Sequence, residues 1–291
     1  MSNHPLAEVF GFPTTNLSPV AERFRNNRLC PYNNKVPSCT KDKAKDPLGV
    51  CSIYSGEQLA ITCPVRFRQD WLIVEEAANF LFPRGTTWTT LQEIRLNDAQ
   101  GKTAGNIDFV LVAYDDEGRI IDFGSLEVQA VYISGNVRRP FAQYMNDRKA
   151  NQDMIWKSTH VRADYLSSSR KRLVPQMLYK GSILQTWQKK QTVALHRAFY
   201  ETLPKLPEVK QEDADVAWLV YELDFIEAQN RFQLAAYETI YTKFKPALQQ
   251  ITTPEAGPID EFVNELQAKL DTKLENAYPP DAPTLADILN Q

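Results

Sequence analysis

Acidic and amide side chains recur in the sequence at spacings that suit phosphate chemistry. Glu93, Asp108 and Glu127 lie on three consecutive strand-like segments, and Gln129 follows Glu127 by two positions. Side chains alternate across a strand, so Glu127 and Gln129 project from the same face. Carboxylates that gather at one end of a sheet repel each other unless a cation lies among them, and Mg²⁺ prefers carboxylate and water oxygens. The pattern predicts a Mg²⁺ site; the alternative is a set of polar side chains on the exposed face of a half-buried sheet.

Three segments form the meander that must position these side chains. They read LQEIRLND (91–98), IDFVLVAY (107–114) and RIIDFGSLEVQAVYISGN (119–136), and turn-forming residues separate them. In antiparallel strands, opposite residues lie close together, so Asp108 is expected to come near Glu127.

Helical and strand patterns flank the meander. Apolar spacing predicts a helix over 70–82 and a second helical stretch from about 140 to 200. The run VAWLVYEL at 216–223 predicts a buried strand, and residues 258–277 have a proline start and helical spacing. The order of elements predicts a mixed α/β fold, a mixed sheet flanked by helices.

All four cysteines, Cys30, Cys39, Cys51 and Cys63, fall in one short window that is rich in turn formers. We expect something other than a hydrophobic core to hold this region together. Disulfides are unusual in a reducing compartment, and four unrelated buried thiols fit poorly with such a loop-rich stretch. A single tetrahedral thiolate site with zinc or iron is the third interpretation, and sequence alone does not choose between the two metals. The predicted division is a four-cysteine region over 1–69 and a second domain over 70–291.

The net charge of −3 conceals a basic segment. Between Arg138 and Arg197 stand thirteen Lys and Arg against three Asp, mixed with aromatic, amide and hydroxyl side chains. A solvated helical face is one explanation, and contacts to nucleic-acid phosphates are the other. The candidate DNA contacts are Arg138, Arg139, Arg162, Arg170, Lys171 and Arg172.

The acidic pattern resembles the motif of the PD-(D/E)XK nucleases. Ile107 and Asp108 stand for the first part, and Glu127, Val128 and Gln129 stand for the second, with glutamine in place of lysine. Glutamine carries no charge and is not a base, so it can only position water or phosphate through hydrogen bonds.

Taken together, the sequence resembles the NotI family of type II restriction endonucleases. The likeness rests on LCPY, SCTK, GVCSI and TCPVRF around the cysteines, on the strand FGSLEVQAVYISGN with its Glu-x-Gln variant, and on WLVYELD near residue 218. It implies a homodimer that cuts double-stranded DNA at a GC-rich palindrome and leaves 5′-phosphate and 3′-hydroxyl ends. It also implies Mg²⁺ at the active site, iron at the four cysteines, and a cognate DNA methyltransferase as genetic partner.

The resemblance gives each candidate residue a role. Asp108, Glu127 and the backbone carbonyl of Val128 would hold Mg²⁺. Glu93 would bind a second metal ion or direct water, and Gln129 would position the nucleophile.

Two other functions remain open at this point. One is a non-catalytic, metal-bearing DNA-binding protein on a silent nuclease fold, and the other is a different PD-(D/E)XK nuclease of repair or recombination. A serine or cysteine nucleophile is disfavoured, because none of the three histidines lies near a nucleophile motif. The N-terminus lacks a basic stretch followed by an apolar run, and no apolar stretch could span a membrane, so we expect a cytoplasmic protein.

Overall fold

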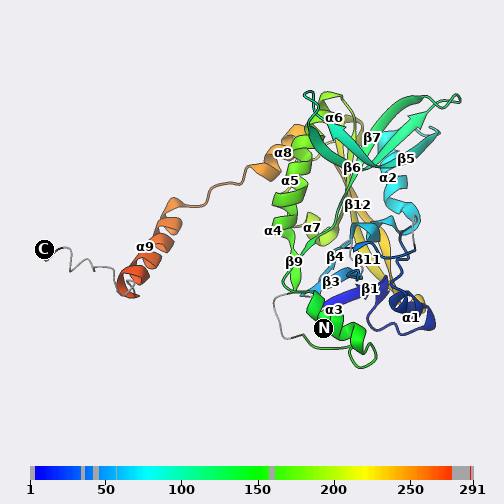
Figure 1. Cartoon of the computed structure of the whole chain (residues 1–291). Coiled ribbons are helices and arrows are strands. Elements are labelled where there is room, and N and C mark those ends of the chain that lie inside the picture. Colours follow the sequence, from blue (N-terminus) through cyan, green and yellow to red (C-terminus); the bar gives the residue numbers. More distant parts are fainter. Residues whose placement is uncertain are drawn as a thin grey trace. The chain divides into compact units, whose positions relative to one another are not determined.

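A six-stranded mixed sheet forms the centre of the fold, in the order β12-β11-β10-β7-β6-β5 (Figure 1). Its strands are β5 (Trp88–Asn97), β6 (Thr103–Tyr114), β7 (Ile120–Gln129), β10 (Gln191–His196), β11 (Val216–Ile226) and β12 (Arg231–Thr242). Strands β5, β6 and β7 form an antiparallel meander, β10 lies parallel to both β7 and β11, and β12 is antiparallel to β11. The predicted meander and the predicted strand over 216–223 are therefore confirmed.

The computed structural model describes residues 4–33, 37–41, 46–56, 58–156, 161–276 and 289. The chain divides into two units, Met1–Thr252 and Thr253–Gln291. The first unit holds both the cysteine region and the large sheet, and the functional division predicted at residue 69 stays a prediction.

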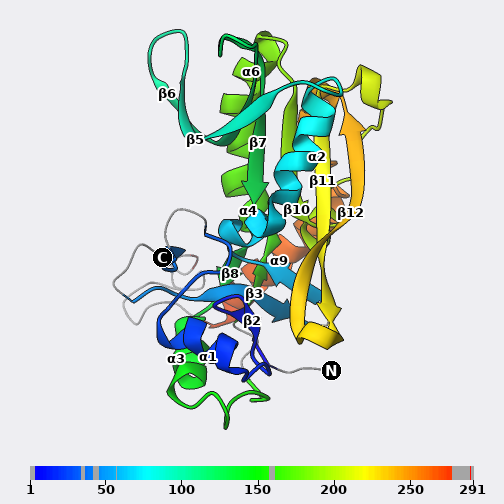
Figure 2. The same ribbon diagram turned by 90° about the vertical axis from the view of Figure 1, so that its right-hand side faces the viewer.

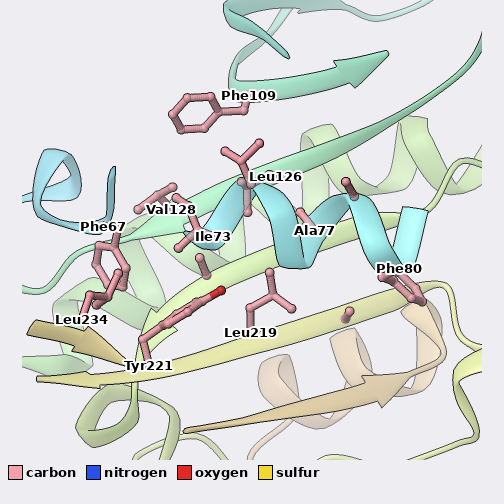
Figure 3. Close-up of a cluster of buried hydrophobic side chains, with 14 of the residues drawn as sticks. Phe67, Ile73, Ala77, Phe80, Phe109, Leu126, Val128, Leu219, Tyr221 and Leu234 are labelled. Atoms are coloured by element: carbon pink, nitrogen blue, oxygen red, sulfur yellow. The ribbon is translucent and has the colours of Figure 1, made fainter. Parts of the chain in front are cut away.

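The helix α2 (Leu72–Leu81) covers one face of the sheet (Figures 2 and 3). Its buried side chains, Ile73, Ala77 and Phe80 among them, pack against Leu126 of β7 and Leu219 of β11. The helix predicted over 70–82 is confirmed. The short 3-10 segment η2 (Pro64–Trp71) leads into it, and its last two residues have left-handed φ values of 52° and 56°.

A winding helical segment covers the opposite face (Figure 1). It consists of α4 (Tyr165–Ser168), η3 (Ser169–Leu173), α5 (Val174–Gln176), η4 (Met177–Gly181) and α6 (Ser182–Thr186). The stretches η3 and η4 are π-helical and flank Pro175, which has no backbone N–H for the usual helical hydrogen bond. Leu173 and Met177 pack on Val193 and Trp218 of the sheet, so this segment is fixed by apolar contacts.

The helical stretch predicted from 140 to 200 is wrong in two places. Helix α3 (Arg138–Asn146) ends early, and the chain later returns to form β9 (Arg162–Asp164) beside β8 (Tyr132–Ser134). Strand β10 lies inside the stretch expected to be helical, followed by α7 (Arg197–Tyr200). All six residues of β10 are buried between two parallel neighbours, and a strand buried on both faces shows no alternation in its sequence.

The cysteine region contains a four-stranded sheet in the order β2-β1-β3-β4. Its elements are β1 (Leu6–Val9), β2 (Phe12–Pro13), α1 (Pro19–Asn26), β3 (Val50–Ser55) and β4 (Gln58–Ile61). Leu6, Phe10 and Ile53 are buried with Phe141 and Tyr144 of α3. The expectation that this region lacks a hydrophobic core is therefore wrong, because residues far along the chain complete that core.

A buried ion pair ties this small sheet to the large one. Arg66 Nε lies 2.9 Å from Glu8 Oε2, and both side chains are fully buried. Arg66 Nη2 also donates to the carbonyl of Phe232 on β12, at 3.0 Å.

The remaining elements lie after β10 and at the C-terminal end of the described chain. They are η5 (Gln211–Asp213), η6 (Glu227–Gln229), α8 (Phe244–Thr252) and, in the second unit, α9 (Ile259–Asn276). The helix predicted over 258–277 is confirmed by α9. None of the helices in the described ranges is both long and apolar enough to cross a membrane.

Candidate active site

Strands β6 and β7 separate where the candidate residues begin. Their pairing runs from Tyr114 opposite Ile120 to Phe109 opposite Leu126. Beyond that point the carboxylate of Asp108 accepts a hydrogen bond from the backbone N–H of Val128, with 2.8 Å between Oδ2 and N. A side chain thus replaces a backbone acceptor, and a half-buried carboxylate is held at the opening between two strands.

Glu127 projects from β7 beside this opening, away from the α2 face. Its side chain is only 9% exposed, and Oε1 lies 2.6 Å from Nζ of Lys180. Burial and, next, the nearby charge of Asp108 raise the pKa of Glu127, Lys180 opposes both effects, and the resulting pKa is about 8. The predicted closeness of Asp108 and Glu127 is therefore observed.

Gln129 is fully buried on the same face of β7 as Glu127. Its Nε2 donates to Oε1 of Gln176, on the helical segment that covers this face. Neither Gln129 Oε1 nor the two carboxylate oxygens of Glu127 accepts a hydrogen bond of good geometry from the described part of the chain. Buried polar atoms are rarely left without partners, so this cluster of acceptors suits a ligand that brings positive charge or donors.

Lys180 is the member of this group that sequence reasoning missed. It is 3% exposed, and its ammonium also donates to the carbonyl of Asn106 on β6, at 2.7 Å. Gln176 and Lys180 lie four positions apart on the covering segment. Gln176 contacts Gln129 and Lys180 contacts Glu127, and these two partners lie two positions apart on β7. The only sequence signal was the place of Lys180 within the basic stretch.

Glu93 lies on the strand next to Asp108, with an exposed side chain. It lies on β5 between the residues that pair with Ile107 and Phe109, which places it at the register position of Asp108. Its side chain is exposed and its φ is 55°, a left-handed value that interrupts the strand. Across the described ranges, no group of three or more His, Cys, Asp or Glu side chains has the spacing of a metal site.

The basic candidates lie on three elements. Arg138 and Arg139 begin α3 and are exposed, as are Arg170 and Lys171 on η3. The pKa of Asp164 is lowered first by a hydrogen bond from the N–H of Ser167 and also by the charges of Lys171 and Arg162.

Arg172 lines a cleft of about 650 Å³ between the cysteine region and the end of β7. Cys63 and Lys41 line the same cleft, together with Tyr132 of β8. The six predicted cations therefore lie on three different elements, and their contacts with DNA stay a prediction.

The four cysteines lie in one neighbourhood. Burial raises the pKa of Cys30 to about 11, and the charges of Cys63 and Cys39 act in the same direction. Burial likewise raises the pKa of Cys51, with further increases from Cys63, Glu8, Cys30 and Cys39. The thiols are therefore close enough to influence each other, but within the described residues they do not have the spacing of a formed metal site.

The family model for restriction endonuclease NotI matches residues 15–234, about three quarters of the chain. The chain belongs to the NotI restriction endonuclease family. The matched range contains all four cysteines, the β5–β7 meander and the covering segment, and it ends within β12. Membership supports a site-specific DNA hydrolase, and the mixed sheet with helices on both faces fits a nuclease fold. No curated protein matches the sequence.

Proposed function

We propose that this protein is a type II restriction endonuclease of the PD-(D/E)XK superfamily that hydrolyses double-stranded DNA with Mg²⁺. The observation that carries the proposal is the pair of carboxylates at the opening between β6 and β7, where Asp108 bonds the N–H of Val128 and Glu127 lies beside it. Family membership supports the reaction class.

Asp108, Glu127 and the backbone carbonyl of Val128 would hold the metal ion. Two observations favour this assignment: Glu127 has two buried oxygens that lack well-aligned donors, and the nearby carboxylate of Asp108 raises its pKa. When bound, Mg²⁺ would offset the negative charge of the reacting phosphate and orient it. Glu93, exposed on β5 at the register position of Asp108, would serve a second ion or direct water.

Gln129 would position the attacking water. Its Nε2 donates to Gln176, and its side-chain carbonyl oxygen has no partner among the described residues. That oxygen can accept a hydrogen bond from the water. The water oxygen would form the new bond to phosphorus as its proton passes to solvent. The bond to the 3′-oxygen breaks and that oxygen takes up a proton, which leaves 5′-phosphate and 3′-hydroxyl ends.

The proposed substrate is a GC-rich palindrome bound by a homodimer. A palindrome presents the same target on both strands, and a two-fold dimer places one site against each. Arginine and lysine recognise guanine through O6 and N7, so the exposed cations of α3 and η3 are the candidates for base and phosphate contacts. A cognate DNA methyltransferase would protect the host DNA.

The four cysteines would bind a structural iron or zinc ion. The cluster joins β3, the start of η2 and the two segments around Cys30 and Cys39. Cys30 and Cys39 flank one β-bridge, and Cys51 and Cys63 lie next to the paired strands β3 and β4. A metal ion there would cross-link these two pairs and hold the cleft that also contains Arg172.

Cleavage of high-GC genomic DNA tests this proposal. The purified protein is incubated with the DNA and Mg²⁺, beside an Asp108→Ala variant, and the fragment ends are sequenced. We expect discrete fragments whose ends share one palindrome, and none with the variant. Tight DNA binding without cleavage by the wild-type protein would contradict the proposal and favour a silent nuclease fold.

A further inference from the structure

We propose that Lys180 is a catalytic residue: its ammonium, supplied by the covering helical segment, donates a hydrogen bond to a non-bridging oxygen of the scissile phosphate. This inference rests on the proposed nuclease function and assigns a cation that the chain itself contributes to the active site. Gln129, at the strand position where a cation would otherwise serve, is neutral.

The position of Lys180 is unusual for a lysine. Lysine is almost never fully buried unless its charge is paired, and this one, 3% exposed, is paired with Glu127. Its ammonium spans the opening, contacting the carbonyl of Asn106 on β6 and the carboxylate of Glu127 on β7. Asp108 lies two positions from Asn106, so alternation along β6 puts it on the same face.

The donors of Lys180 are not all used. An ammonium group has three N–H donors, and the described residues supply two acceptors, Asn106 O and Glu127 Oε1. The contact with Glu127 is an ion pair without good hydrogen-bond geometry, so at least one donor is left for a ligand. Glu127 Oε2 and Gln129 Oε1 also lack hydrogen-bond partners among the described residues. A phosphate oxygen is an acceptor of the required charge.

The charge balance of the metal-bound site also favours a contact between Lys180 and the phosphate. With a divalent ion bound and Glu127 deprotonated, Asp108, Glu127 and one phosphodiester would carry three negative charges, and the ion would offset two of them. The ammonium of Lys180 supplies the third positive charge in a site that is too buried for solvent to screen it. In this role the lysine stabilises charge and transfers no proton.

The surrounding fold holds this lysine in place. A side chain at Gly181 would come within 2.6 Å of the ring of Phe244 and within 2.9 Å of Gln191 Oε1, so the segment packs closely there. Gly105, with a φ of 116°, lies under the stem of Lys180, where an added Cβ would contact its Cδ at 3.6 Å. The π-helical turn that contains Lys180 follows Pro175, and such turns are frequent at functional sites.

The test compares Lys180→Met with Lys180→Arg in the full chain. Methionine keeps the apolar stem without the charge, and arginine keeps the charge. Lys189→Met is the matched control, because Lys189 forms an ion pair of the same 2.6 Å length with Asp122, away from the site. Single-turnover cleavage, affinity for the uncleaved duplex in Ca²⁺ under conditions without cleavage, and thermal unfolding are measured for each protein.

We expect Lys180→Met to slow cleavage by about 100-fold, as for loss of one preorganised donor to a reacting oxyanion. Its affinity for the duplex should change by less than about fivefold, because the contact strengthens as charge develops on the phosphate. Lys180→Arg should cleave faster than Lys180→Met, and Lys189→Met should behave as the wild type.

Two results would overturn the inference. One is cleavage by folded Lys180→Met within threefold of the wild type, and the other is equal loss in folded Lys180→Met and Lys180→Arg. If Lys180→Met does not fold, Lys180→Gln, which keeps a donor for Glu127, replaces it in the same comparison. Failure of the nuclease proposal itself is distinguishable, because the wild-type protein would then cleave no DNA at all.

Discussion

Two buried ion pairs in this protein differ in how completely they are satisfied. In the Glu8–Arg66 pair, Glu8 accepts from both Arg66 and Ser52, and the guanidinium donates further to Gln69 and Phe232. In the Glu127–Lys180 pair, both carboxylate oxygens lack a well-aligned hydrogen bond. A fully bonded pair fixes the fold, whereas a pair with unused donors and acceptors is prepared for a ligand. We therefore interpret the first pair as structural and the second as part of the active site.

The largest effect should come from Asp108→Asn. The amide keeps the size of the side chain but removes the charge that would hold the metal ion, so cleavage should fall by roughly 1,000-fold, the equivalent of about 4 kcal/mol. Initial cleavage rates on a plasmid that contains the recognition site measure this loss. Asp122→Asn, on β7 and ion-paired with Lys189, is the matched control and should keep its activity. Equal losses in both variants would contradict the assigned role of Asp108.

Cys51→Ser extends the comparison to the cysteine cluster, where a buried thiolate at Cys51 would need positive charge beside it. If a metal ion supplies that charge, the variant should bind less metal and lose more than about 3 kcal/mol of unfolding free energy. Metal analysis and urea unfolding measure the two effects, with Ser38→Ala beside Cys39 as the control. A wild-type protein that is purified without metal and is as stable as metal-loaded protein would contradict the structural-metal proposal.

Glu8→Gln should break the structural pair without touching the active site. Removal of one charge leaves the guanidinium of Arg66 buried without its counter-charge, which costs about 3 kcal/mol of stability. Urea unfolding monitored by tryptophan fluorescence measures the change. Cleavage per folded molecule should match the wild type, and a selective loss of activity in stable protein would show that the two pairs are not separate in function.

The smallest effect concerns His196, a buried ionisable group that lies outside both pairs. Burial lowers its pKa to about 4 from 6.5, so the folded state binds a proton less readily than the unfolded chain does. Stability from this group is complete above pH 6.5 and is lost as the pH falls toward 4. By pH 5 the loss should be about 2 kcal/mol.

The difference in unfolding free energy between the wild type and His196→Gln isolates this contribution, because all other groups titrate in both proteins. The wild-type protein should lose more stability than the variant between pH 7 and pH 5. Parallel pH curves would contradict the assignment of a neutral, buried His196.

Much of the fold and part of the site could be predicted from sequence. Helix α2 and the β5–β7 meander have clear periodicity, and the alternation along β7 correctly placed Glu127 and Gln129 on one face. Strand β10 was missed because it is buried on both sides. Lys180 was missed because its meeting with Glu127 depends on how a helical segment fifty residues later packs across the sheet, which no local pattern encodes.

Glu127→Gln and Glu8→Gln, measured side by side, test the central claim most directly. The measurements are cleavage rate per folded molecule and unfolding free energy, made on the same preparations. We predict that Glu127→Gln slows cleavage by about 100-fold in protein that remains folded, and that Glu8→Gln loses stability while its folded fraction cleaves normally. Wild-type cleavage by Glu127→Gln would contradict the claim that the incompletely satisfied pair marks the active site.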